Sequence, residues 1–225
     1  MAESTSPLRP RDALLAGATG LVGRQLLYRL IASPGYERVH ALLRRPSKGL
    51  PSDPKLQLHF VDFAQLPPMP PVDDVFMTLG TTIAVAGSKE AFRRVDYDAV
   101  LNTARACVAR GATRLIVISS LGADARSRIF YNRVKGQMEQ AVVKLGYESV
   151  VIVQPSLLTG DRAAIAQPTR AGEEWTMRLL RPVMRFVPMG VRPIAAATVA
   201  QAMLDAAVNA QPGLRILKSG EMQSR

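Results

Sequence analysis

Tyrosine and lysine stand four residues apart at Tyr131 and Lys135, within a pattern that predicts a helix over Ile129–Leu145. Residues at i and i+4 share one helix face, so the phenol and the ammonium can point to the same place. A free tyrosine titrates at about pH 10, and a nearby ammonium favours the phenolate. Such a pair can exchange a proton with a substrate nearer to neutral pH.

Two serines, Ser119 and Ser120, end a run of β-branched and apolar residues that predicts a strand over Arg114–Ser119. A hydroxyl at the end of that strand can donate a hydrogen bond to a carbonyl oxygen while the tyrosine protonates it. The residues alone leave open whether Ser119 or Ser120 fills this role. A Tyr-x-x-x-Lys string also occurs by chance on ordinary helix faces, but the upstream serines favour the catalytic interpretation.

Three glycines, Gly17, Gly20 and Gly23, follow the short apolar run Ala13–Ala16 and lead into a helical pattern over Leu21–Ala32. This is a strand, a tight turn and a helix. Glycines let the backbone turn sharply and approach a pyrophosphate, and the helix N-terminus offers N–H groups to the phosphates. The spacing is GxxGxxG, and its position between strand and helix favours a dinucleotide site over a ligand-free turn.

The end of the second predicted strand, Arg38–Leu43, indicates which dinucleotide is bound. An acidic residue commonly holds the adenosine ribose at this point, but here Arg44 and Arg45 follow the strand. Guanidinium groups suit a 2′-phosphate, so we expect NADP(H). The alternative is that both arginines are solvated surface residues.

Further contacts are expected where later strands end. Asp62 is placed to accept a hydrogen bond from the adenine amino group, and the Gly80–Thr82 turn lets the backbone pass close to the nicotinamide ribose. The full expected cofactor set is Gly17, Thr19, Gly20, Leu21, Val22, Gly23, Arg44, Arg45, Asp62, Phe63, Gly80, Thr81, Thr82, Lys135, Pro155 and Leu157.

Strand and helix patterns alternate along residues 11–155, which predicts right-handed βαβ units and a parallel sheet. The other predicted strands are Asp12–Ala16, Leu56–Val61, Val72–Leu79, Ser149–Val153 and Leu214–Leu217, and the other helices run from a Ser88 cap to Arg110 and over Ala195–Val208. With the glycine turn after the first strand, the fold class is α/β, a doubly wound Rossmann domain.

Residues 156–225 are expected to form a small C-terminal substrate or lid region packed on that domain. Thr159–Arg170 reads as a loop, and Glu173–Phe186 as a helix interrupted by Pro182. This stretch predicts an apolar pocket for a small-molecule substrate, because it contains Trp175, Met177, Leu179 and Met184. The alternative is that these side chains only dock the region on the sheet.

Composition narrows the class of protein. The 225 residues carry a net charge of +11, but the basic residues are scattered, so no nucleic-acid partner and no peripheral membrane contact is expected. Cys107 is the single cysteine and fits the core of a protein in a reducing compartment. We expect a cytoplasmic monomer or homodimer. His40 and His59 lack spaced partners, so no metal site is expected.

Together these motifs give a family resemblance. The chain resembles the atypical branch of the short-chain dehydrogenase/reductase superfamily, and it is most similar to the small Tat-interacting-protein-like, NAD(P)-binding or epimerase-like oxidoreductases. The resemblance covers Asp12 to about Leu217. It implies that Tyr131 is the proton donor, Lys135 its electrostatic partner and a ribose ligand, and Ser120 the substrate anchor.

The chain departs from the family pattern in two places. Many members have Pro-Gly where this chain has Pro155-Ser156, and many have a relay asparagine whose nearest match here is Asp98, with Asn102 one turn on. The resemblance implies an NADP-dependent oxidoreductase that reduces a carbonyl. The rival hypothesis is an NADP(H)-binding regulatory or protein-interaction module without turnover.

Overall fold

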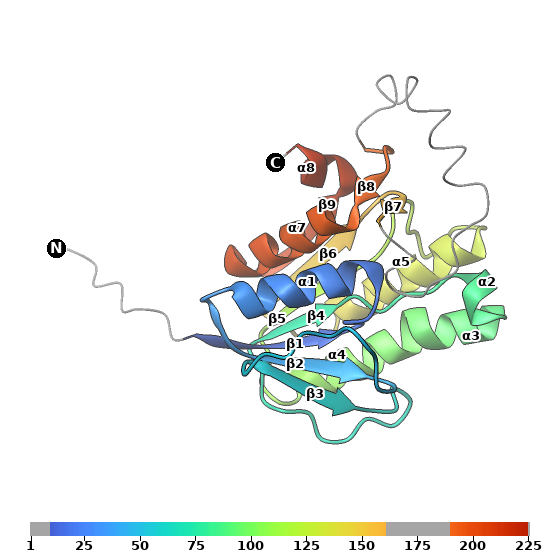
Figure 1. Cartoon of the computed structure of the whole chain (residues 1–225). Helices are drawn as coiled ribbons and strands as arrows, with labels where there is room; N and C mark the ends of the chain where they lie inside the picture. Colours follow the sequence, from blue (N-terminus) through green and yellow to red (C-terminus); the bar gives the residue numbers. More distant parts are fainter. Residues whose placement is uncertain (1–9, 161–189, 225) are drawn as a thin grey trace.

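The computed structural model describes residues 10–160 and 190–224. Within these residues, seven parallel strands form one sheet in the order β3-β2-β1-β4-β5-β6-β9 (Figure 1). The strands are β1 (Arg11–Ala16), β2 (Tyr36–Leu43), β3 (Leu56–Phe60), β4 (Asp74–Met77), β5 (Arg114–Ile118), β6 (Ser149–Gln154) and β9 (Gly213–Lys218). The prediction of a doubly wound parallel sheet is confirmed.

Helices cover both faces of the sheet. They are α1 (Leu21–Ala32), α2 (Ile83–Ala86), α3 (Lys89–Arg93), the π-helical η1 (Arg94–Ala99), α4 (Val100–Val108), α5 (Phe130–Val143), α7 (Ala196–Val208) and α8 (Ser219–Gln223). Two neighbouring residues of β1 show why the sequence of a strand in this sheet is a continuous apolar run: they are buried on opposite faces of the sheet. Leu15 packs into the core under α1 and α7, and Leu14 into the core under α4 and α5.

The strand order reverses between β1 and β4, which lie side by side in the middle of the sheet. In doubly wound sheets the crevice at this switch point, outside the carboxyl ends of the strands, receives the ligand. Every predicted site residue follows a strand at that edge or lies on the helix after it. The topology therefore gathers residues that are far apart in sequence.

Several element boundaries differ from the prediction. The helix capped by Ser88 is interrupted by the π-helical turn η1. The predicted cap is present, because the Ser88 hydroxyl accepts a hydrogen bond from the Ala91 N–H at 3.0 Å. β2 begins at Tyr36 rather than Arg38. The short elements α2, α8 and the pair β7 (Leu158–Thr159) and β8 (Ile194–Ala195) were not predicted, because segments of two to five residues carry no hydrophobic period.

The C-terminal region contributes to the main sheet. β9 pairs with β6, and α7 packs on the same face as α1. Most of the predicted Thr159–Arg170 loop and all of the predicted Glu173–Phe186 helix lie outside the described residues. Among the helices of residues 10–160 and 190–224, none has the length and apolar character needed to cross a membrane.

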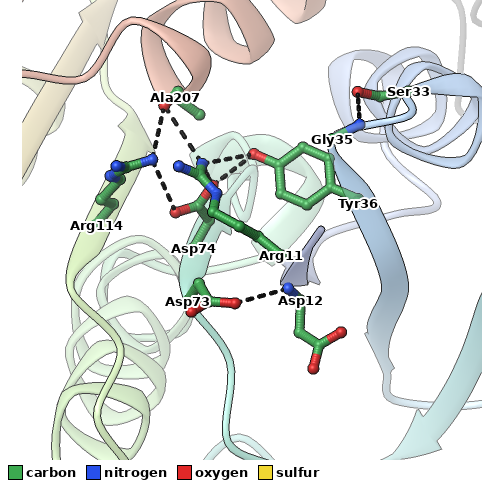
Figure 2. A network of polar contacts seen from close by, with 9 residues as sticks. All are labelled: Arg11, Asp12, Ser33, Gly35, Tyr36, Asp73, Asp74, Arg114 and Ala207. Carbon is green, nitrogen blue, oxygen red and sulfur yellow. Dashed lines mark hydrogen bonds and ion pairs between the residues drawn. The ribbon is translucent and has the colours of Figure 1, made fainter. Parts of the chain in front are cut away.

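A buried polar cluster stabilises the opposite, amino-terminal edge of the sheet (Figure 2). Asp74, fully buried on β4, forms an ion pair with Arg11 of β1 and accepts a hydrogen bond from the Tyr36 hydroxyl at 2.5 Å. Arg114 lies 3.9 Å from the other carboxylate oxygen and donates to the Ala207 carbonyl of α7 at 3.3 Å. Burial raises the pKa of Tyr36 to about 12, so the phenol stays protonated as the donor.

Candidate functional site

Two glycines of the turn between β1 and α1, Gly17 and Gly23, are packed too tightly to carry a side chain. Gly17 has φ +96°, and a Cβ there would lie 2.6 Å from the backbone carbon of Thr78 at the end of β4. A Cβ on Gly23 would fall on the Gly17 carbonyl oxygen. The turn therefore holds the start of α1 directly against the ends of β1 and β4, at the switch point.

The first turn of α1 has a composition that leaves its N-terminus open to an anion. Its cap residue Gly20 supplies no side-chain hydrogen bond, and the first turn contains no acidic side chain. Thr19 lies in the glycine turn, and Leu21 and Val22 are the first two residues of α1. The Val22 side chain is buried. Unpaired N–H groups and the positive end of a helix dipole suit a pyrophosphate, so this cradle fits a dinucleotide.

The predicted adenosine-side residues lie beyond β2 and β3. Arg44 and Arg45 are exposed where β2 ends. Asp62, also exposed, accepts a hydrogen bond from the Ala64 N–H at 2.8 Å, which shapes the turn after β3. The Phe63 side chain is buried in the core, so only its backbone is at this edge, and its carbonyl accepts from Asn102 at 3.2 Å.

The Gly80–Thr82 turn follows β4 and leads into α2. The Thr82 hydroxyl caps α2 by accepting from the Val85 N–H at 3.2 Å. The Thr81 N–H donates to a carboxylate oxygen of Asp96 at 2.9 Å. Gly80 sits above that contact, since a Cβ there would be 3.5 Å from Asp96 Oδ1 and 3.8 Å from Lys135 Nζ. The turn thus lies on the lysine of the predicted catalytic pair.

Lys135 lies on the buried face of α5 and forms an ion pair with Asp96 of η1, with Nζ 2.7 Å from Oδ1. The side-chain exposures are 3% for Lys135 and 0% for Asp96. Burial alone would lower the pKa of Lys135, but the charge of Asp96 outweighs it and the pKa is raised above the usual value. The ammonium is therefore kept charged inside the protein.

Tyr131 lies one turn before Lys135 on α5 and is half-buried. Its ring packs on Phe92 of α3, with the ring centroids 5.2 Å apart. Its charge interaction with Lys135 also raises the pKa of the lysine, so the two groups are close enough to influence each other. The structure brings the predicted pair together, as the i, i+4 spacing indicates.

The loop that carries Ser119 and Ser120 is held against α5. The Asp124 N–H donates to the Asn132 carbonyl at 3.0 Å, and a Cβ on Gly136 would collide with the backbone of Asp124. Both serines are buried, at 5% and 9% exposure. Neither the Ser119 nor the Ser120 hydroxyl has a hydrogen-bond partner among the described residues, and Ser119 is the one close to Glu139 of α5.

Glu139 stands one turn after Lys135 and continues the polar face of α5. Its carboxylate accepts from Gln154 Nε2 at 2.9 and 3.1 Å, at the end of β6. Burial raises the pKa of Glu139, while the hydrogen bonds from Gln154 and the nearby Ser119 hydroxyl oppose that shift. Tyr131, Lys135 and Glu139 thus line one stripe of the helix.

Asp96 is the site residue that the sequence did not reveal. The search for the family's relay asparagine favoured Asp98, with Asn102 one turn on. Asp98 is partly exposed, and Asn102 donates to the Phe63 carbonyl instead. The π-helical turn makes position 96 the one that faces α5. The sequence carries no sign of this, because Asp96 and Asp98 both stand in a helical pattern rich in charged residues.

The remaining predicted residues lie at the end of β6. The Pro155 carbonyl accepts from the Leu121 N–H at 2.8 Å, and the Leu157 carbonyl accepts from Ile194 at 2.9 Å. Ser156, which replaces the glycine that many family members have, donates to the Arg192 carbonyl and accepts from the Ser219 hydroxyl. Its side chain therefore connects this edge of the site to the segment before β8 and to α8.

His40 and His59 form a pair on β2 and β3, with Nδ1 and Nε2 2.9 Å apart. Burial lowers the pKa of both imidazoles. Over residues 10–160 and 190–224, no group of three or more histidine, cysteine or acidic side chains is arranged to hold a metal ion. Cys107 is buried in the core, and burial raises its pKa to about 12.

Relatives with curated names share much of the chain. The mitochondrial protein fmp52 of Emericella nidulans is 36% identical over 159 residues, which is 67% of this chain and 68% of its own. That of Aspergillus fumigatus is 34% identical over 214 residues, 92% and 88% of the two chains. Because these relatives are named mitochondrial, the expectation of a cytoplasmic protein is wrong.

Solved structures share the fold at low sequence identity. MoeE5 in complex with UDP-glucose and NAD has a TM-score of 0.68 at 20% identity, covering 95% of this chain and 80% of that one. The PhqB reductase domain from Penicillium fellutanum has a TM-score of 0.64 at 17% identity, covering 96% and 70%. Such identities support the shared fold and nothing finer.

The family model described as NAD(P)H-binding matches residues 17–210, from the first glycine of the turn to just beyond α7. This span contains the glycine turn, the Gly80–Thr82 turn and the Tyr131–Lys135 face. The chain therefore belongs to the NAD(P)H-binding family, and its relatives and fold fit the atypical short-chain dehydrogenase/reductase branch that its motifs resemble.

Proposed function

We propose that this protein is an NADP(H)-dependent oxidoreductase that reduces the carbonyl group of a small apolar substrate. The observation that carries the proposal is the buried, charged Lys135 on the same face of α5 as Tyr131, directly beneath the Gly80–Thr82 turn. A buried ammonium is costly to a fold, and perturbed ionisable groups of this kind cluster at functional sites.

The residues present fit a nicotinamide dinucleotide along the carboxyl edge of the sheet. The glycine turn and the α1 N-terminus would hold the pyrophosphate, and the Gly80–Thr82 turn and Lys135 would hold the nicotinamide ribose. When bound, the reduced cofactor supplies the hydride for the carbonyl carbon.

The chain supplies the proton and the charge. Tyr131 would donate its hydroxyl proton to the carbonyl oxygen as the C–O double bond becomes a single bond. Lys135 would stabilise the phenolate left behind. The Ser120 hydroxyl, buried and without a partner among the described residues, would donate a hydrogen bond to the same oxygen.

The preference for NADP(H) rests on Arg44 and Arg45. Both are exposed at the end of β2, where the adenosine ribose of a dinucleotide lies in this fold. No carboxylate stands in their place to bind the 2′-hydroxyl. Two guanidinium groups can hold a 2′-phosphate with charge-assisted hydrogen bonds.

The apolar substrate is supported by the side chains around the site. Val85, Leu121, Ile129 and Leu157 are exposed on the segments that follow β4, β5 and β6 or lead into α5. Exposed apolar groups that gather near one edge suit an apolar ligand. The Trp175 region, which the sequence linked to this pocket, lies outside the described residues.

A screen of aliphatic and aromatic aldehydes and ketones with NADPH tests the proposal. We expect NADPH oxidation by the wild-type protein and a loss of at least about 100-fold in Tyr131→Phe, since a positioned proton donor contributes 10²–10⁴-fold. Tyr28→Phe, on the exposed side of α1, is the control and should retain activity. Tight NADPH binding with no turnover of any carbonyl would instead favour the regulatory module.

A further inference from the structure

The carboxylate of Asp96 connects three separate segments of the site. One oxygen pairs with Lys135 Nζ of α5 at 2.7 Å, and the other accepts the Thr81 N–H of the β4–α2 turn at 2.9 Å. Asp96 itself belongs to η1, and it is fully buried. A single side chain thus joins the helix of the catalytic pair to the turn expected to hold the nicotinamide ribose.

The π-helical turn explains why an acidic residue is tolerated at this depth. Such turns are rare in proteins, but those that occur are often found at functional sites. The extra residue in the turn changes the direction in which a side chain points. Burying a carboxylate is costly unless a counter-ion and hydrogen-bond donors satisfy it. Lys135 and the Thr81 N–H provide both, so the burial of Asp96 depends on the other two segments being in place.

We propose that Asp96 is a positioning residue of this site, which holds the Lys135 ammonium and the Gly80–Thr82 turn as one preorganised unit. The inference rests on the proposed function, because it assigns these two elements to the cofactor and to proton transfer. The consequence is that the lysine is oriented, and the turn shaped, before a cofactor binds. Preorganisation of this kind raises affinity by removing the cost of ordering the site.

The charges that face Lys135 come from two elements. Asp96 approaches from η1, and Tyr131 and Glu139 flank the lysine along α5. Among the described residues, Asp96 is the acidic group that forms an ion pair with the ammonium, whereas Glu139 accepts hydrogen bonds from Gln154. Asp96→Asn keeps the shape and can still accept the Thr81 N–H, but it removes the counter-ion. Burial is then opposed only by the smaller effects of Tyr131 and Glu139 among the described residues, so the pKa of Lys135 should fall.

The test compares the wild type with Asp96→Asn and with Asp98→Asn, a matched change on a partly exposed residue of the same turn. NMR titration of ¹³C-labelled lysine, without cofactor, reports the pKa of Lys135, whose signal is identified by its loss in Lys135→Arg. Calorimetry at pH 7.5 and pH 9 reports NADPH affinity. Circular dichroism confirms that each variant is folded.

In Asp96→Asn we expect the Lys135 pKa to fall by about 1 pH unit or more. NADPH affinity should fall on the order of tenfold, equivalent to about 1.4 kcal/mol, with a larger loss at pH 9 as the lysine discharges. Asp98→Asn should match the wild type in both measurements. A folded Asp96→Asn protein with unchanged affinity would overturn the positioning role, whatever its Lys135 pKa.

Two further outcomes are decisive. If Asp96→Asn does not fold, a wild-type Lys135 that titrates below the ordinary value of about 10.4 overturns the inference, because the inference requires the charge of Asp96 to outweigh the effect of burial on that pKa. If the wild type binds neither NADPH nor NADH, the proposed function fails. The lysine titration then still shows whether Asp96 holds the ammonium, so the two failures are distinguishable.

Discussion

At the scale of single residues, the site combines groups that spacing reveals with one that only packing reveals. The i, i+4 spacing of Tyr131 and Lys135 places them on one face of any helix, so their pairing could be predicted from the sequence. Asp96 is 39 positions from Lys135 in the chain, and its role depends on how η1 packs on α5. No periodicity encodes that contact, and counting along a regular helix pointed to Asp98.

The preference for a 2′-phosphate can be tested on two exposed residues. We expect the double variant Arg44→Ala/Arg45→Ala to lose NADPH affinity by about 1.5–3 kcal/mol per lost charge-assisted contact, with little change for NADH. Calorimetry with both cofactors measures the difference. Arg215→Ala, an exposed arginine on β9, should leave both affinities unchanged. Equal losses for NADPH and NADH in the double variant would exclude recognition of the phosphate.

At the scale of elements, the regular part of the fold was readable and the short elements were not. The buried strands β1 and β5 and the helix α1 follow from continuous apolar runs and a 3.6-residue period. The π-helical η1 was hidden because its residues fit a continuous helix. α2 was hidden because four residues hold too few apolar positions to show a period.

The glycine turn makes a prediction about α1 as a unit. A Cβ at position 23 would collide with the Gly17 carbonyl, so Gly23→Ala must push the helix away from the turn. We expect a loss of about 1–3 kcal/mol in the free energy of unfolding, as for other overpacked sites, together with weaker NADPH binding. Urea denaturation and calorimetry measure the two effects. Gly35→Ala, beyond the other end of α1, meets only an ordinary contact and is the control.

The histidine pair between β2 and β3 makes stability depend on pH. Because burial lowers the pKa of His40 and His59 in the folded state, the unfolded chain binds more protons once the pH falls below about 6.5. The free energy of unfolding should therefore decrease from pH 7.5 to pH 5.5. We expect a smaller decrease in His59→Gln than in the wild type. Urea titrations at the two pH values measure this free energy. If it decreased equally in the wild type and in His59→Gln, the assignment to the histidine pair would be contradicted.

At the scale of the whole molecule, the two edges of the sheet have different tasks. The carboxyl edge gathers the glycine turn, the Gly80–Thr82 turn and the α5 face. The amino edge carries the ion cluster of Asp74 with Arg11 and Arg114, which joins β1, β4, β5 and α7 (Figure 2). The place of the site residues at the carboxyl edge was predictable from the topology alone. The ion cluster at the amino edge was not, because it depends on side-chain contacts between segments that are distant in the sequence.

Breaking that cluster should cost stability without affecting the cofactor site. Asp74→Asn leaves Arg11 without its buried counter-ion, so we expect the free energy of unfolding to fall by about 3 kcal/mol. NADPH affinity, measured below the unfolding temperature, should stay within about twofold of the wild-type value. A twofold change is much smaller than the tenfold change that corresponds to about 1.4 kcal/mol. A large affinity loss in a folded Asp74→Asn protein would show that the two edges are coupled.

The central claim is that Tyr131 and Lys135 complete a carbonyl reduction on a cofactor held by the glycine turn. The most direct measurement incubates the protein with a carbonyl substrate and NADPH deuterated at C4, followed by mass spectrometry of the alcohol. We predict deuterium on the former carbonyl carbon with the wild type, and at least about 100-fold less labelled alcohol with Tyr131→Phe. Labelled alcohol formed equally by both proteins, or by neither, would contradict the account.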